Sequence, residues 1–492
     1  MVVAARTSST PFETKRVSRP SSRRPRLLPT YLARLKFPLL CGALFLALGT
    51  LPSNALVEPG IEGWEEVVQE IETSLPGPAG AMLAETADEF GKLGCELAAA
   101  PLRELMIELE SLRGLQFKYF TPCHSKIKTR FRRYIRTELE RVYTPEMIDK
   151  EESLLKALGL VPIEFQVVPF TEELLTDAVA GIYDTTTDQF FLVDSESGSS
   201  FTEGLRNRAV STLTGDTRSI TIIHELDHAL GGQHFPLLAK IDALVDTASH
   251  DELMAVKALV EGDASFVMFD HQGGSAPELL GGDLYLSGLD AASDLMLRFP
   301  LPLPGMGKFN QAPLYYRRSL LFPYYVGAEF VSSVRHVEQD WTEVNRAYDD
   351  PPFSTAQIYE PSRYLYLPNT PSNPDFSKLP ARFGAWTRID DQTGGEFLLR
   401  VLLEQYGVKN FREAAGGWMG DRLRIYRNTA TGALGFYWVI RWLDVWEAQE
   451  FYTSLGSRLP FEVEREDTVT IISLAFTKPE LRSLRAAVSG LR

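Results

Sequence analysis

One helical stretch with two histidines constrains this chain more than any other part of its sequence. Residues 220–235 contain His224, Glu225 and His228 in an H-E-x-x-H pattern. Side chains four residues apart lie on one face of an α-helix, one turn from each other. The two imidazoles can therefore bind a single ion. Apolar residues precede and follow the pattern, so we expect a buried helix that carries a metal site.

The glutamate that directly follows the first histidine indicates which chemistry such a site would perform. Zinc binds imidazole and carboxylate ligands, and it lowers the pKa of a bound water from about 16 to about 7. Glu225 lies next to the face of the two histidines, where its carboxylate can take a proton from that water. The pattern thus predicts Zn²⁺ as the cofactor and Glu225 as a general base. The competing interpretation is an amphipathic core helix with two hydrogen-bonded histidines.

Two residues compete for the place of the third metal ligand. His234 completes H-E-x-x-H-x-x-G-x-x-H with Gly231, which is the spacing of the metzincin peptidases. In that case Gly231 and Gly232 would end the helix and let the chain turn back. Glu261 lies instead in a second apolar stretch, roughly residues 252–269. An unpaired carboxylate on its small, apolar helix face would be costly to bury, which favours a metal partner.

Further residues of the second stretch favour Glu261 over His234. Gly262 would allow two helices to approach closely. A metzincin also needs a methionine in a turn beneath the metal, whereas Met254 and Met268 fall inside the predicted helix. We therefore expect His224, His228 and Glu261 as the metal ligands, and His234 remains the alternative to Glu261.

The segments around these residues resemble a known group of enzymes. H-E-L-D-H-A-L-G-G-Q-H-F followed by A-L-V-E-G-D-A is similar to the gluzincin zinc metallopeptidases. The chain resembles more specifically a set of exported bacterial metallopeptidase-like proteins. The likeness continues at residues 321–327, 341–364 and 414–422, and it spans roughly residues 160–460. It implies two histidines and a glutamate as zinc ligands, with Glu225 as the base.

The chain departs from these relatives at two positions. Glu360 stands where the relatives commonly place a histidine before a proline, and Asp227 stands between the two histidines where a hydroxyl residue is usual. If the missing histidine stabilises the transition state, the departure reduces catalytic power. The predicted ligands are intact.

The first 55 residues differ from the rest of the chain. They contain nine Lys and Arg residues against one acidic residue, followed by an apolar run at 37–51 that is short for a membrane span. This pattern is typical of an export signal, cleaved near Ala55, which favours a periplasmic or extracellular protein. A two-part leader to an organelle lumen and an uncleaved anchor are the alternatives. Export would permit a disulfide between Cys95 and Cys123, or the two thiols would stay unpaired.

Charge and composition limit the partners. The chain carries a net charge of −15, so we expect no binding to nucleic acid, and no stable membrane insertion once the leader is removed. A basic segment at 126–141 is interpreted as a solvated helix face beside the acidic bulk of the protein. The expected partner is a polypeptide substrate. The oligomeric state stays open.

The length of 492 residues suggests several regions. We expect a leader at 1–55, a helical N-terminal region at 56–155, a zinc metallopeptidase core at 156–275 and an α+β region at 276–492 that covers or completes the cleft. The fold class is α+β. Alternating apolar residues predict strands at 163–168, 181–184 and 189–193, the last two as a hairpin. The list of further expected elements comprises helices at 320–339, 393–406 and 447–455, strands at 435–444 and 468–476, loops at 274–307 and 351–371, and a structural turn with Trp418, Asp421 and Arg422.

These observations predict a zinc-dependent metallopeptidase that hydrolyses peptide bonds with a metal-activated water. The alternative function is a catalytically weak or inactive zinc-site protein that acts as a binding or scaffold module. The natural substrate and the choice between endopeptidase and exopeptidase activity do not follow from the sequence.

Overall fold

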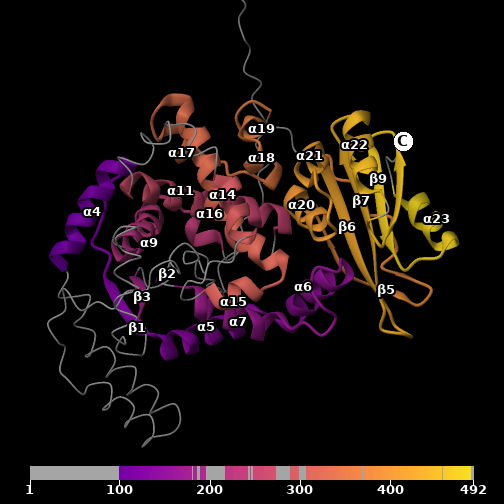
Figure 1. The fold of residues 1–492 in the computed structure, drawn as a ribbon, viewed down its shortest axis with the longest axis horizontal. Helices are drawn as coiled ribbons and strands as arrows, with labels where there is room; N and C mark the ends of the chain where they lie inside the picture. The colour runs from indigo at the N-terminus through magenta and orange to yellow at the C-terminus, as the bar shows by residue number, and fades with distance from the viewer. Residues whose placement is uncertain are drawn as a thin grey trace, which may run out of the picture. The chain divides into compact units, whose positions relative to one another are not determined.

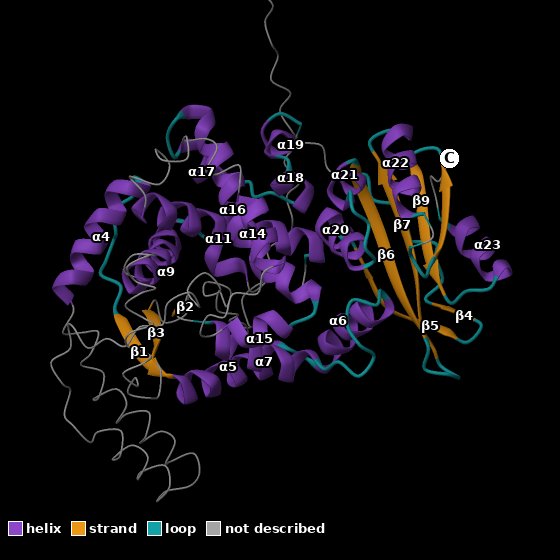
Figure 2. Ribbon diagram, in the orientation of Figure 1, coloured by secondary structure: helices purple, strands orange, loops and turns teal. Residues whose placement is uncertain are grey.

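The fold is α+β, as expected from the sequence (Figures 1 and 2). The computed structural model describes residues 99–179, 181–184, 189–194, 217–241, 244, 248–272, 289–298, 306–367, 371–456 and 458–488. All of them belong to one compact unit, Leu35–Arg492. The predicted leader at 1–55 and Cys95 lie outside the described residues, whereas Cys123 is buried. In the described part of the chain, no helix has the length and apolar character needed to cross a bilayer.

A small sheet lies in the N-terminal half of the described chain. Its order is β1-β3-β2, formed by Cys123–Ile127, Gln189–Asp194 and Gly181–Asp184. The hairpin predicted from 181–184 and 189–193 is confirmed, because β2 pairs with β3 in antiparallel register. Strand β1, which pairs with β3 in parallel, was not predicted. Its sequence, C-H-S-K-I, has little of the alternating apolar pattern that marks a strand.

The strand predicted at 163–168 is wrong. The segment forms a turn, in which the amide of Phe165 donates to the carbonyl of Pro162, and helix α7 (Val167–Ala178) begins at its end. The carboxylate of Glu152 accepts a hydrogen bond from the amide of Val167 at 2.9 Å. Of the apolar residues in this pattern, Ile163 is exposed, and Phe165 packs on the ring of Phe170 at a centroid distance of 4.9 Å.

Four helices surround the predicted metal ligands. They are α4 (Ala99–Arg113), α9 (Thr217–His234), α11 (His250–Gln272) and α16 (Leu314–Glu338). Helix α9 packs against α4, α11 and β2, and α11 packs along α16. Nearly every residue of α11 between Asp251 and Phe269 is buried, which explains why its apolar residues follow no single stripe.

The predicted close approach of two helices at Gly262 is present. A Cβ atom on Gly262 would lie 2.3 Å from the carbonyl carbon of Gly327 in α16, and a Cβ on Gly327 would lie 2.2 Å from the carbonyl oxygen of Ala258. Such distances are far below van der Waals contact. Only a glycine at each position allows α11 and α16 to meet backbone to backbone.

The basic segment at 126–141 covers the end of β1 and most of α5 (Lys128–Val142). Its cations pair with acidic residues of α7: Arg132 and Arg136 with Glu172, and Lys128 with Asp177. The segment therefore neutralises an acidic helix within the protein.

The C-terminal part contains a six-stranded antiparallel sheet of order β4-β5-β6-β7-β9-β8. The strands are Arg382–Phe383, Trp386–Gln392, Trp418–Asn428, Leu434–Trp442, Val469–Leu474 and Glu462–Glu466 in that order. Both faces of β7 are buried, because Phe436 and Trp438 join the main core whereas Tyr437 and Val439 join a second cluster under α23 (Lys478–Ala487). The predictions for β7 and β9 are confirmed within two residues.

The remaining helices complete the scaffold. They are α6 (Pro145–Ala157), α14 (Leu289–Arg298), α15 (Met306–Gln311), α17 (Thr342–Ala347), α18 (Thr355–Tyr359), α19 (Pro361–Leu365), α20 (Gly395–Gln405), α21 (Phe411–Gly416) and α22 (Val445–Leu455). The predicted loops at 274–307 and 351–371 are thus partly helical. One hydrophobic cluster runs from Leu102 to Ile472, so the regions expected at 56–155, 156–275 and 276–492 share a core.

Candidate metal centre

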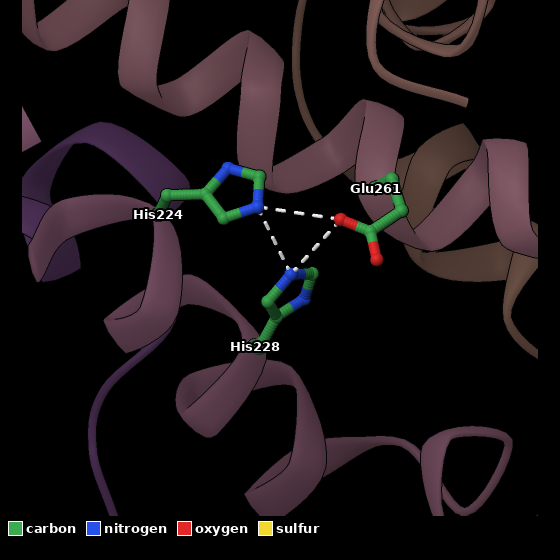
Figure 3. Close-up of side chains that lie close together, drawn as sticks. All are labelled: His224, His228 and Glu261. Carbon is green, nitrogen blue, oxygen red and sulfur yellow. Dashed lines mark hydrogen bonds and ion pairs between the residues drawn. The ribbon is translucent and has the colours of Figure 1, made fainter. Parts of the chain in front are cut away.

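Two neighbouring helices bring three of the predicted residues together. His224 and His228 project from successive turns of α9, and Glu261 projects toward them from α11 (Figure 3). The two histidines share a helix face because they are four residues apart. The glutamate is held opposite them because the next residue, Gly262, fixes α11 against α16.

The three donor atoms form a nearly equilateral triangle. The Nε2 atoms of His224 and His228 are 3.2 Å apart, and each lies 3.3 Å from Oε2 of Glu261. Zinc bonds to nitrogen and carboxylate oxygen are about 2.0–2.1 Å long. A tetrahedron with such bonds has edges of about 3.3–3.4 Å, so the triangle matches one face of a tetrahedral zinc site. The donor set of two imidazoles and one carboxylate also suits zinc.

The charges at the centre are strongly coupled because water is excluded. Each of the three side chains is 1% exposed. Burial alone would raise the pKa of Glu261, but the two imidazoles outweigh it and lower that pKa to about 2. Burial likewise opposes protonation of His228, yet the carboxylates of Glu261, Glu225 and Asp227 raise its pKa to about 9. A buried carboxylate is therefore available as an anionic ligand.

Glu225 lies on α9 beside the two histidines and is fully buried. Burial raises its pKa to about 8, and the charge of Glu261 adds to this effect. Strand β2 passes directly over it, since a Cβ atom on Gly181 would lie 3.3 Å from Oε1 of Glu225 and 2.7 Å from Thr221. The carboxylate of the predicted base is thus close to the metal ligands and to the backbone of an outer strand.

An aromatic side chain of α16 completes the wall of the centre. The ring of Tyr324 stacks on the ring of His224, with 5.7 Å between centroids and an interplanar angle of 26°. Tyr324 is fully buried. Stacking of this kind restricts rotation of the imidazole and so helps to direct its Nε2 atom toward Glu261.

The structure places His234 away from the other ligands. The helix end at Gly231 and Gly232 that the His234 alternative requires is absent, because α9 continues through both glycines and ends at His234. Gly232 is needed for a different reason: a Cβ atom there would lie 2.9 Å from the hydroxyl of Tyr183. The ring of His234 makes a 2.8 Å hydrogen bond with the carbonyl of Gln116. Of the two candidates for third ligand, only Glu261 reaches the histidines.

The two positions at which the sequence departs from the peptidases that it resembles have different surroundings. Glu360 is exposed and pairs with Arg363. Asp227 is buried, and it lies near Arg113 of α4 and Asp263 of α11. The sequence patterns did not indicate a role at the site for Arg113, Asp263 or Tyr324. Asp263 and Tyr324 do lie within segments that carry the resemblance, Asp263 two residues after Glu261 and Tyr324 within 321–327.

No other group of three potential ligands converges among the residues that the structure describes.

Comparison with known proteins finds one family: a domain of unknown function (DUF8575) matches residues 382–478. This segment runs from the start of β4 through β9 and comprises the six-stranded sheet with α20, α21 and α22. No curated protein and no solved structure matches the chain. The matched domain does not include His224, His228 or Glu261.

Proposed function

We propose that the protein is a zinc-dependent metallopeptidase in which His224, His228 and Glu261 hold the metal. The observation that carries this proposal is the triangle of donor atoms, whose sides of 3.2, 3.3 and 3.3 Å suit a tetrahedral zinc ion. Such an ion would have a fourth position for water or substrate. The resemblance to the gluzincins supports the same ligand set.

The residues of the centre would have separate roles in hydrolysis. A bound zinc ion would polarise the scissile carbonyl and acidify a water molecule. Glu225 would take the proton of that water and pass it to the leaving amine. A general base works best with a pKa near the working pH, and burial raises that of Glu225 to about 8. No side chain among the described residues donates a hydrogen bond to its carboxylate, which leaves the group available for this role.

The position of β2 supports a polypeptide as the substrate. In the sheet order β1-β3-β2, β2 is an edge strand. Its residue Gly181 lies against Glu225. An extended peptide can pair with such an edge through its backbone. A substrate bound in this way would lie next to the general base.

A second candidate function is a zinc-site protein with little or no catalysis, used for binding or as a scaffold. Two observations favour it. Glu225 and the three ligands are almost completely enclosed, which restricts access for a substrate. In addition, Glu360 replaces the histidine that the related peptidases commonly place there, and it pairs with Arg363 on the surface.

Cleavage of an unfolded polypeptide distinguishes the two functions. The purified, zinc-loaded protein should cleave unfolded casein, and Glu225→Gln should abolish cleavage while zinc stays bound. The matched control is Glu396→Gln, which alters another buried glutamate, in α20 beside Arg400; this variant should remain active. If Glu225→Gln is as active as the parent, the peptidase function is wrong. A zinc-loaded parent without activity would favour the scaffold function.

A further inference from the structure

A buried arginine lies beside the metal centre without touching it. Arg113 is the last residue of α4, and its side chain is 1% exposed. Its Nε and Nη2 atoms donate to Oδ2 of Asp263 at 3.2 and 2.9 Å. The hydroxyl of Tyr348 donates to the same oxygen at 2.8 Å. Asp263 belongs to α11, two residues after the ligand Glu261.

The same arginine also interacts electrostatically with a carboxylate on the other ligand helix. Asp227 of α9 immediately precedes His228, and it attracts the guanidinium electrostatically. Oδ1 of Asp227 and Nη1 of Arg113 are both buried and without a hydrogen-bond partner among the described residues. One buried cation thus pairs with a carboxylate on α11 and is attracted by a carboxylate on α9, and each carboxylate lies within two residues of a predicted metal ligand.

Aromatic rings fix the position of the guanidinium. It lies over the ring of Trp341 at 4.2 Å and over the ring of Phe235 at 5.8 Å. Phe235 in turn stacks on Tyr348 at 4.1 Å. A planar guanidinium can stack on rings and donate in its plane at the same time, which an ammonium group does not do. The arrangement therefore depends on an arginine and not only on a positive charge.

We propose that Arg113 is a positioning residue of the metal centre, the shared counter-ion that sets the spacing of α9 and α11. Two buried carboxylates without a cation would repel each other, and each would seek another partner. Since Asp227 and Asp263 are on the ligand helices, their displacement would distort the donor triangle. The inference rests on the proposed zinc site.

The test measures zinc affinity by competition with a chelator, together with the absorption spectrum of the Co²⁺-loaded protein. Arg113→Gln should raise the Kd for zinc by about tenfold or more and change the Co²⁺ spectrum. Arg113→Lys keeps the charge but loses the planar fork, so its Kd should lie between those of the parent and Arg113→Gln. Neutralising both carboxylates in Arg113→Gln, through Asp227→Asn and Asp263→Asn, should restore most of the affinity.

A matched control separates positioning from general stability. Arg424 is also buried and pairs with Asp391, but in the six-stranded sheet. Arg424→Gln should lower the melting temperature without changing the Kd for zinc. Unchanged zinc affinity and Co²⁺ spectrum in folded Arg113→Gln or Arg113→Lys would overturn the role of Arg113. An incorrect assignment of the zinc site gives a different result from an incorrect role for Arg113, because the parent protein would then take up no zinc.

Discussion

Gly262 and Gly327 bring two helices into direct backbone contact next to the predicted ligand Glu261. A Cβ atom on Gly262 would lie 2.3 Å from the carbonyl carbon of Gly327. Since Glu261 precedes Gly262, the depth to which α11 packs on α16 also fixes the carboxylate opposite the two histidines. The packing of two glycines therefore contributes directly to the geometry of the candidate site.

Gly262→Ala should destabilise the protein by about 3 kcal/mol, because the added methyl group meets backbone atoms that cannot move aside. The variant should also bind zinc less tightly, since α11 has to shift. Chemical unfolding and zinc titration measure the two effects. The control is Gly307→Ala in α15, where a Cβ atom would meet nothing within 4 Å. If Gly262→Ala is as stable as this control, the close contact is wrong.

Asp421 provides a prediction on the six-stranded sheet. The sequence suggested a structural turn here, but Asp421 lies in strand β6, and its carboxylate accepts hydrogen bonds from the amides of Gly394 and Gly395 and from Trp418 Nε1, at 2.8, 2.8 and 2.9 Å. Asp421→Ala would leave three buried donors without an acceptor and should cost about 3 kcal/mol. Zinc content should not change. Asp349→Ala, at an exposed position, is the control; equal unfolding midpoints for the two variants would argue against a structural role.

His250 gives the protein a predicted dependence on pH. Burial, with the charge of Lys257, lowers its pKa from 6.5 to about 4. The folded state therefore favours the neutral ring, and this contribution to stability is complete above pH 6.5 and is lost as the pH falls from 6.5 toward 4. The free energy of unfolding should fall by about 2 kcal/mol. This is less than the full pKa shift of His250 implies, because its side chain is only half-buried.

The measurement compares the parent with His250→Gln by chemical unfolding between pH 4 and pH 7. The stability of the parent should fall more steeply with acidification than that of the variant. His336→Gln, at an exposed position of α16, should behave like the parent. Parallel curves for the parent and His250→Gln would show that His250 does not titrate in this range.

Export is a further prediction. Because the basic and apolar pattern of residues 1–55 is typical of a cleaved signal, protein isolated from its native host should begin close to Leu56. Mass spectrometry of the intact chain decides this. A protein that retains Met1 or stays in the membrane fraction would favour the uncleaved anchor.

The elements that carry the site were predictable because their patterns are local. The four-residue spacing of the histidines and the long apolar stretch around Glu261 predict α9 and α11, and the alternating residues of β2 and β3 predict their hairpin. Local patterns also explain why some sequence-based expectations differ from the structure. Gly231 and Gly232 would permit a helix end, but α9 continues through them, and the small size of Gly232 serves its close packing against Tyr183.

The surroundings of the site were not predictable because they depend on contacts between distant segments. Arg113 and Asp263 are 150 positions apart in the sequence, and nothing near Arg113 indicates that its charge is buried. The choice between His234 and Glu261 likewise required the relative position of α9 and α11. Sequence patterns favoured Glu261, but only the packing of the helices brings its carboxylate to the histidines.

The most direct test of the zinc site is the metal content of three purified proteins, measured by inductively coupled plasma mass spectrometry. The parent should hold about one zinc ion per chain. Glu261→Gln should lose most of it, because the change removes the negative charge and one ligand oxygen, whereas His234→Ala should keep it. Full zinc occupancy in Glu261→Gln, or an empty site in His234→Ala, would contradict the assignment of His224, His228 and Glu261 as the metal ligands.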